Sequence, residues 1–283
     1  MPRTRSTART ISTFLAAALP LSVPCALTAP DARADGGPAP ATRGVGQQPG
    51  HPAVLYSGQE RTVAAYCPQG TKPTGGGASV DSDLRSAVYF RKSLPDPAGN
   101  RWVLLAYNAS PDVQTVHPKV ICSTDSTLTY EASKETQLEP GETGFTEAKC
   151  GTNRYVVGGG FEGGDRTFVT SSGSLNGGGW AVYMKYTNYS PDAPASFQRS
   201  AAVCSDTQPV WKFGTTADLA PGEVGNATAE CPAGQVPLSG SADGGTDVLL
   251  TTSAPTATGW TAWAKNDGFD RRKLLVDVLC TTP

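Results

Sequence analysis

"LEPGETGFTEAKCGTNRYVVGGG", at 138–160, is the middle one of three related stretches in this chain. The stretch at 55–77 reads "LYSGQERTVAAYCPQGTKPTGGG", and the one at 219–241 reads "LAPGEVGNATAECPAGQVPLSGS". In each copy a cysteine follows the first leucine by 12 residues, and a glycine-rich triplet begins 8 residues after that cysteine. Self-similarity in such a register predicts a repeat architecture, and it governs the interpretation of every other element.

Each copy continues to a tryptophan and ends on a cysteine within an apolar stretch. The repeats run 55–123, 138–205 and 219–281, and their tryptophans are Trp102, Trp180 and Trp260. The segments that begin at these tryptophans, such as "RWVLLAYN" and "GWTAWAKN", alternate with period two, which is typical of strands. Turn residues recur at short intervals and no segment has helical periodicity, so we expect an all-β protein.

Three repeats of about four strands each predict a pseudo-threefold, closed domain. Closure of this kind buries the apolar face of every repeat against the others and leaves few free strand edges. We expect a β-prism-like arrangement, with a β-trefoil as the alternative. The prism is favoured because the segment from first to last cysteine, 50 to 56 residues, is long for a trefoil repeat.

The glycine triplet at 75–77 could also bind phosphate. A phosphate-binding loop needs a following Lys-Ser/Thr and the start of a helix, because the lysine and the helix amides hold the anion. Neither is present after any of the three triplets. We therefore expect the glycines to lie where a strand enters a crowded place that leaves no room for Cβ atoms.

The first 52 residues differ from the repeats. A basic start, an apolar run at 11–27 and the small-residue site "ARA" at 32–34 predict a signal peptide over 1–34 and a secreted, extracellular protein. Residues 35–52 are rich in Pro and Gly, and we expect them to form a disordered leader. The single all-β domain then spans 53–283. No segment is long and apolar enough to predict membrane insertion.

Charge also excludes some partners. The chain has 23 basic and 25 acidic residues, and the signal peptide would remove four arginines and one aspartate. A secreted chain with a net charge of −5 and no basic cluster is a poor candidate for binding nucleic acid.

Six cysteines follow the signal peptide, and an even number in a secreted chain indicates disulfides. The threefold repetition leaves two natural pairings. The first closes each repeat on itself (Cys67–Cys122, Cys150–Cys204 and Cys231–Cys280), and the second links neighbouring repeats (Cys122–Cys150, Cys204–Cys231 and Cys280–Cys67). We favour the first. We expect no metal site and no cofactor, because neither CxxC nor HxxxH spacing occurs.

The succession of a Cys-Pro-x-Gly opening, a glycine-rich triplet, a tryptophan and a closing cysteine stands at 67–122 and 231–280. It resembles a repeat of secreted proteins from high-GC Gram-positive bacteria. The triple copy is also similar to the vitelline membrane outer layer protein I family, whose fold is a β-prism of three Greek-key sheets. The resemblance covers 55–280 and implies that fold and a carbohydrate-related role. The middle copy departs from it, with "GTN" at 151–153, and no functional residue is transferred.

Catalytic groups are scarce in this sequence. The only histidines are His51, in the leader, and His117, without a counterpart in the other repeats, so we expect no catalytic residue. Asp83, Asp165 and Asp247 fall 16, 15 and 16 residues after the first cysteine of each repeat. They are typical of Asx turns at hairpin tips, and equivalent ligand contacts or a calcium site are the alternatives.

Aromatic residues are the better functional candidates. We expect the three repeated tryptophans in the core, whereas Tyr183 and Trp263 alternate to the opposite face at one repeat position, where the first repeat has Leu105. Flat exposed rings stack on sugars and also serve as protein contacts. We therefore expect a non-catalytic, lectin-like binding module for cell-wall or environmental polysaccharide. The alternative is an extracellular protein-binding or structural protein, such as a protease inhibitor, a toxin-complex subunit or an envelope component. The sequence does not determine the oligomeric state.

Overall fold

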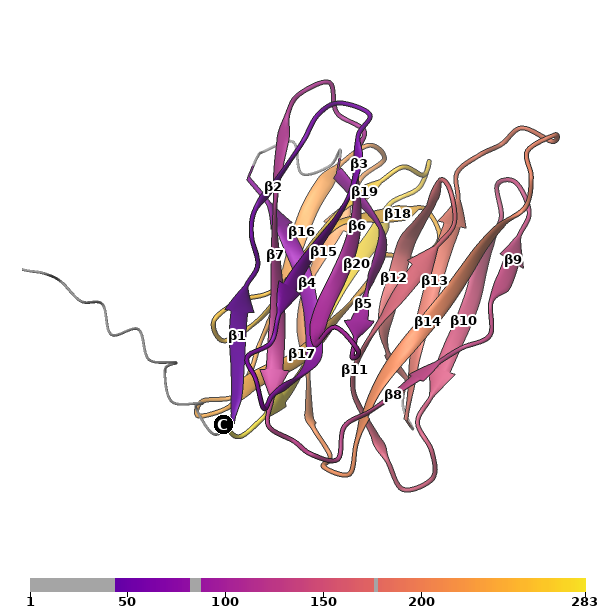
Figure 1. Ribbon diagram of the computed structural model, residues 1–283. Coiled ribbons are helices and arrows are strands. Elements are labelled where there is room, and N and C mark those ends of the chain that lie inside the picture. Colours follow the sequence, from indigo (N-terminus) through magenta and orange to yellow (C-terminus); the bar gives the residue numbers. More distant parts are fainter. Residues whose placement is uncertain (1–43, 82–87, 176–177) are drawn as a thin grey trace, which may run out of the picture. The chain divides into compact units, whose positions relative to one another are not determined.

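The computed structural model describes residues 44–81, 88–175 and 178–283. These residues form 20 strands and no helix, so the all-β prediction is confirmed (Figure 1). All of the strands belong to one compact unit, Pro40–Pro283. The predicted signal peptide and Asp83 lie outside the described residues.

Each repeat holds five strands rather than the four that we predicted. The first repeat has β3 (Glu60–Tyr66), β4 (Lys72–Val80), β5 (Val88–Asp96), β6 (Arg101–Asn108) and β7 (Gln114–Ser123). The second has β10 (Thr143–Lys149), β11 (Tyr155–Gly163), β12 (Thr167–Leu175), β13 (Gly179–Tyr186) and β14 (Ser196–Ser205). The third has β16 (Val224–Glu230), β17 (Val236–Asp243), β18 (Val248–Pro255), β19 (Gly259–Asn266) and β20 (Arg272–Thr281). We predicted strands before the first cysteine, after the glycines, at the tryptophan and at the last cysteine; the additional strand, β4 and its counterparts β11 and β17, contains the glycine triplet itself.

Further strands precede each repeat. They are β1 (Val45–Pro49) and β2 (Ala53–Leu55), β8 (Thr129–Ala132) and β9 (Thr136–Leu138), and β15 (Val210–Leu219). β1 lies within the segment for which we predicted a disordered leader, and it pairs with β7 through five residue pairs. The described end of that segment is therefore an ordered edge strand.

The strands form three sheets, each with strands from two repeats. The β1 sheet has the order β1-β7-β4-β18-β19-β16, with β2 also on β7. The β3 sheet has the order β3-β6-β5-β11-β14-β8, with β9 also on β14. The six-stranded sheet has the order β10-β13-β12-β17-β20-β15. None of these sheets is closed, which corrects the closed domain that we expected: every sheet ends in two edge strands.

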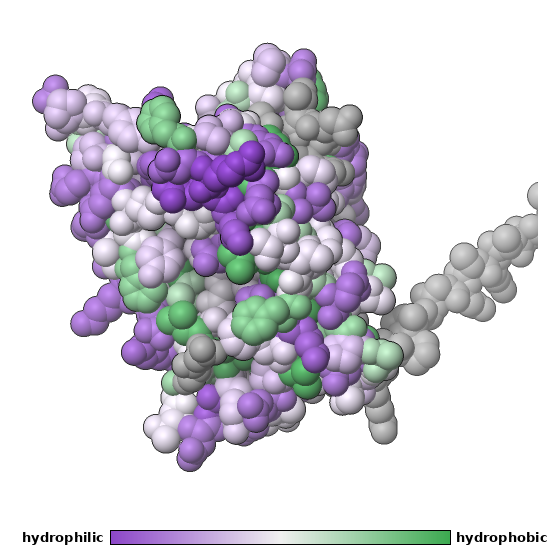
Figure 2. Space-filling model, turned by 180° about the vertical axis from the view of Figure 1, so that it is seen from behind, coloured by the Kyte–Doolittle hydropathy of each residue, from purple (hydrophilic) through white to green (hydrophobic). Residues whose placement is uncertain are grey.

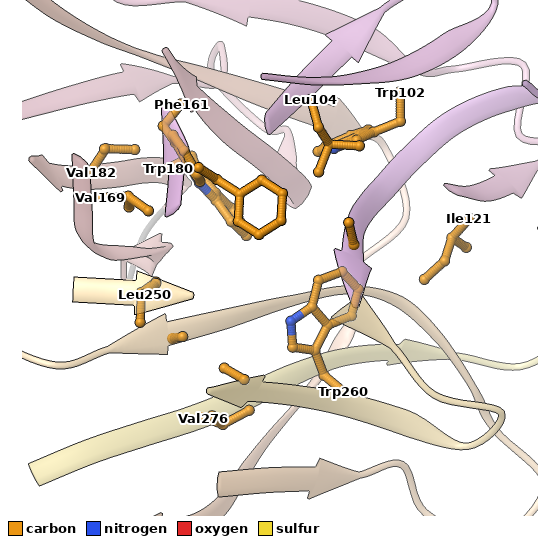
Figure 3. Close-up of a cluster of buried hydrophobic side chains, with 14 of the residues drawn as sticks. Trp102, Leu104, Ile121, Phe161, Val169, Trp180, Val182, Leu250, Trp260 and Val276 are labelled. Atoms are coloured by element: carbon orange, nitrogen blue, oxygen red, sulfur yellow. The ribbon is translucent and has the colours of Figure 1, made fainter. Parts of the chain in front are cut away.

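The core explains the glycine triplets. Trp102, Trp180 and Trp260 are at most 2% exposed, as predicted, and they converge with other apolar side chains from several strands (Figure 3). A Cβ atom on the middle residue of each triplet would lie 2.1–2.4 Å from an atom of the tryptophan of the same repeat; these residues are Gly76, Gly159 and Gly240. The indole ring therefore packs directly on the backbone of the glycine triplet, and the predicted crowding is confirmed. Each indole N–H donates a hydrogen bond of 2.9 Å to a serine on the preceding strand: Ser93, Ser172 or Ser253.

The disulfides close each repeat on itself, as we favoured. Their Cα atoms are 5.6–5.8 Å apart in the pairs Cys67–Cys122, Cys150–Cys204 and Cys231–Cys280. Each closes a loop of 49 to 55 residues, which contributes about 4 kcal/mol in the chain-entropy account. Three such bonds are compatible with an oxidising environment.

Candidate functional site

Two pairs of aromatic rings lie on the six-stranded sheet. Phe145 on β10 and Tyr183 on β13 are register partners, with ring centroids 5.0 Å apart, and both are about two-fifths exposed. Trp211 and Phe213 on β15 have centroids 4.5 Å apart, and Phe213 is 72% exposed. The two pairs stand on opposite edge regions of one sheet, because β10 and β15 are its edge strands.

The strands between the two pairs carry small residues. Ser171 on β12 is the register partner of both Tyr183 and Asp243, so all three point to the same side of the sheet. Gly173 follows two positions later, and a Cβ atom there would be 2.6 Å from the Cβ atom of Ser241. These small residues lie beside Leu275 of β20, the register partner of Asp243, which is 40% exposed. We call the surface formed by Phe145, Tyr183, Ser171, Gly173, Ser241, Asp243, Asp277, Trp211 and Phe213 the aromatic face.

Two carboxylates belong to the aromatic face. Asp277 on β20 is the register partner of Ser241 and Phe213, and Asp243 on β17 is the partner of Leu275. Among the described residues, neither carboxylate has a basic nitrogen within 4.0 Å. Asp243 Oδ1 accepts a hydrogen bond of 3.1 Å from the Gly245 N–H, and each carboxylate keeps acceptor capacity for a ligand.

The ionisation of Asp277 is unfavourable in this place. Burial raises the pKa of its carboxyl group, and the negative charge of Asp243 raises it further. A hydrogen bond of 3.3 Å with the Ser241 hydroxyl opposes the shift. The indole of Trp211 lies against the same carboxyl group, although its buried N–H has no hydrogen bond of normal geometry with any described residue.

A pocket continues the aromatic face beyond Trp211. Its volume is about 460 Å³, and Trp211, Tyr155 and Leu175 form apolar walls. Polar groups also line it, from Asn153, Arg154, Ser174 and Gln208. Apolar walls with a few polar groups are typical of small-molecule sites, and this volume is in their usual range. Figure 2 shows one side of the molecule on which hydrophobic residues gather in patches beside a cluster of strongly hydrophilic residues.

The structure separates the two aromatic residues that the sequence singled out. Tyr183 lies on the aromatic face, whereas Trp263 lies on β19 in the β1 sheet and is half-buried. Leu105, at the same repeat position, lies on β6 in the β3 sheet. The equivalent positions therefore occupy three different sheets and do not form one site.

The two described aspartates of the predicted set have different partners. Asp165 is 3.4 Å from Arg91 and lines another pocket, of about 420 Å³, to which Asp247 does not contribute. Asp247 is 2.6 Å from Lys185 and 3.4 Å from Arg272. The hydrogen bond from Lys185 is the main cause that lowers the pKa of Asp247. In the described ranges, no group of three or more His, Cys, Asp or Glu side chains is placed to hold a metal ion.

Sequence reasoning missed Trp211, Phe213, Asp243 and Asp277. The first two lie on β15, which precedes the third repeat and is not part of the stretch that recurs. A local signal was present, since "VWKF" at 210–213 alternates aromatic and polar residues as a half-buried strand does.

Comparisons with known proteins give no relative for this chain: no protein-family model matches it, and no curated protein is significantly similar. Within the described residues, no helix is long and apolar enough to cross a membrane.

Proposed function

We propose that this is a secreted, non-catalytic, lectin-like protein that binds polysaccharide on the aromatic face. One observation carries the proposal: two pairs of aromatic rings stand on one sheet, with Phe145, Tyr183 and Phe213 exposed and Trp211 partly buried. Flat rings offer apolar area at a small entropic cost, and the C–H faces of sugar rings are their natural partners.

The same proposal includes a pseudo-threefold, β-prism-like architecture. The strand orders support it, because each sheet joins corresponding strands of two repeats. In the six-stranded sheet, β12, β13 and β10 of the second repeat meet β17 and β20 of the third, with β15 at the edge. The β3 sheet repeats this order with β5, β6 and β3 beside β11, β14 and β8. The resemblance to the vitelline membrane outer layer protein I family implies the same architecture.

Retention on insoluble polysaccharides and purified cell walls tests the proposed function. Phe213→Ala and Tyr183→Ala should each weaken retention about three- to tenfold, because each removes one stacking ring. Phe269→Ala is the matched control, since Phe269 is 98% exposed and lies outside the aromatic face. Trp263→Ala should have no effect. If the oxidised, folded protein is retained on none of these materials, the polysaccharide proposal is wrong.

A second candidate function is the binding of an extracellular protein. The nearly complete exposure of Phe269, in the turn between β19 and β20, favours it, because a single exposed aromatic side chain can anchor a protein interface. In that case a specific protein should co-purify with the wild type. The Phe269→Ala variant should no longer retain that protein, whereas the Phe213→Ala variant should.

A further inference from the structure

The outer surfaces of two sheets differ at equivalent positions. In the β3 sheet, three neighbouring strands carry Lys92, Glu162 and Arg199 as direct register partners. Lys92 is 2.9 Å from Glu162, and Arg199 also pairs with Glu162. The carboxylate in the middle of that sheet is thus neutralised from both sides.

The six-stranded sheet has the same backbone positions but lacks the cations. Ser171, Asp243 and Leu275 are the register partners there, so the acid remains while a serine and a leucine replace the two bases. The next row adds a second acid, Asp277, where the β3 sheet has Ala201. Two carboxylates on neighbouring strands therefore stand between the two pairs of aromatic rings, and no basic nitrogen of the described residues lies within 4.0 Å of either.

This arrangement is costly without a ligand. Burial raises the pKa of the Asp277 carboxyl group, and the negative charge of Asp243 on the neighbouring strand raises it further. A positive charge bound between Asp243 and Asp277 would offset their repulsion. It would take the place that Lys92 and Arg199 have beside Glu162 in the β3 sheet. A protonated amine supplies three N–H donors, and the aromatic pairs on both sides select a flat, ring-shaped carrier for it.

We propose that the aromatic face recognises a polysaccharide of amino sugars with free, protonated amino groups, and that Asp243 and Asp277 hold these groups. The inference rests on the proposed function, because it names the ligand class of the same surface. A neutral polysaccharide would use the rings and leave the carboxylates uncompensated. Charge complementarity therefore points to the cationic polymer.

The test compares two oligosaccharides of equal length, one of glucosamine and one of N-acetylglucosamine, by calorimetric titration at a pH where the amines are protonated. The wild type should bind the glucosamine oligomer at least about tenfold more tightly, since a hydrogen bond to a charged group is worth roughly that factor. Asp243→Asn and Asp277→Asn should each remove about this factor for the glucosamine oligomer and leave binding of the acetylated oligomer unchanged. Asp192→Asn, an exposed acid outside the face, is the matched control and should change neither.

Every other outcome overturns the inference. Equal binding of the two oligomers that Phe213→Ala weakens would reject the amino-sugar assignment and keep the polysaccharide proposal. Preference for glucosamine that Asp192→Asn reduces as strongly would show attraction by net charge alone. Binding of neither oligomer nor any other saccharide would reject both proposals together.

Discussion

The β3 sheet and the six-stranded sheet share a backbone plan and present different surfaces to solvent. Outward positions that hold Lys92, Glu162 and Arg199 in one sheet hold Ser171, Asp243 and Leu275 in the other. Inward positions hardly change, because a tryptophan, a glycine and a disulfide recur in every repeat. The repeats have thus kept the residues that pack the core, while the outer surface of each sheet has diverged.

The carboxyl groups on the two sheets have pKa shifts in opposite directions. Burial alone would raise the pKa of Glu162, but hydrogen bonds and charge from Lys92 and Arg199 outweigh it and lower that pKa. Burial likewise raises the pKa of Asp277, and there the neighbouring charge of Asp243 adds to the shift. The carboxylate of the β3 sheet stabilises the fold, whereas that of the six-stranded sheet is held at a cost that a ligand can relieve.

The largest effect is expected when the six-stranded sheet is given the cations of the β3 sheet. Ser171→Lys together with Leu275→Arg should reduce oligosaccharide affinity by about 100-fold or more, because the long side chains cover the aromatic face and form ion pairs with Asp243. Calorimetric titration measures this, and the free energy of unfolding should be nearly unchanged. The control Ser190→Lys with Val113→Arg adds the same charges at exposed positions elsewhere. Undiminished binding by the first double variant would show that the ligand does not use this face.

An intermediate effect on stability is expected from the two equivalent acids. Glu162→Gln should lower the free energy of unfolding at pH 7 by about 1–3 kcal/mol, because it removes the negative charge and one of the two acceptor oxygens that Lys92 and Arg199 use. Asp243→Asn should change it by less than about 0.5 kcal/mol.

Since the folded pKa of Glu162 is lowered, its contribution is present above the unfolded value near 4.5 and is lost as the pH falls through the folded pKa. Urea titrations at several pH values measure both variants. If Glu162→Gln and Asp243→Asn lowered the free energy of unfolding equally at pH 7, the proposed difference between the two sheets would be wrong.

The smallest effect concerns Asp277. The pKa of Asp277 is raised in the folded state. Its ionisation therefore lowers the free energy of unfolding above the folded pKa, and this loss is absent below the unfolded value near 3.8. Asp277→Asn should therefore raise the melting temperature at neutral pH, and the difference from the wild type should shrink as the pH falls toward 3.8. A lower melting temperature of the variant at neutral pH would mean that the charge of Asp277 stabilises the fold.

The sequence predicted the core because the core repeats. The three tryptophans, the crowded glycines and the disulfide pairs all follow from one register. The fifth strand was missed for a local reason: β4, β11 and β17 carry the glycine triplets, and each contains a bulge, between Pro73 and Gly75 in the first, which breaks the period-two pattern.

The candidate site was predictable only in part. Tyr183 was found because it occupies a repeat position, but the other half of the aromatic face comes from the third repeat and from β15. Each sheet takes strands from two repeats, so residues at one repeat position lie on separate sheets, and residues at unrelated positions meet. Asp277 and Phe213 become neighbours only when β20 pairs with β15, and the local sequence patterns do not predict that pairing.

The most direct test of the aromatic face uses the five tryptophans as reporters. In a titration with the saccharide that the protein binds best, the indole N–H signals are followed by nuclear magnetic resonance. Trp102, Trp180 and Trp260 are buried and hydrogen-bonded, and Trp263 lies on another sheet. We expect the Trp211 signal alone to shift, saturably and with the affinity found by calorimetry. A shift of Trp263 with a stationary Trp211 would contradict the account, because it would place the ligand on the β1 sheet.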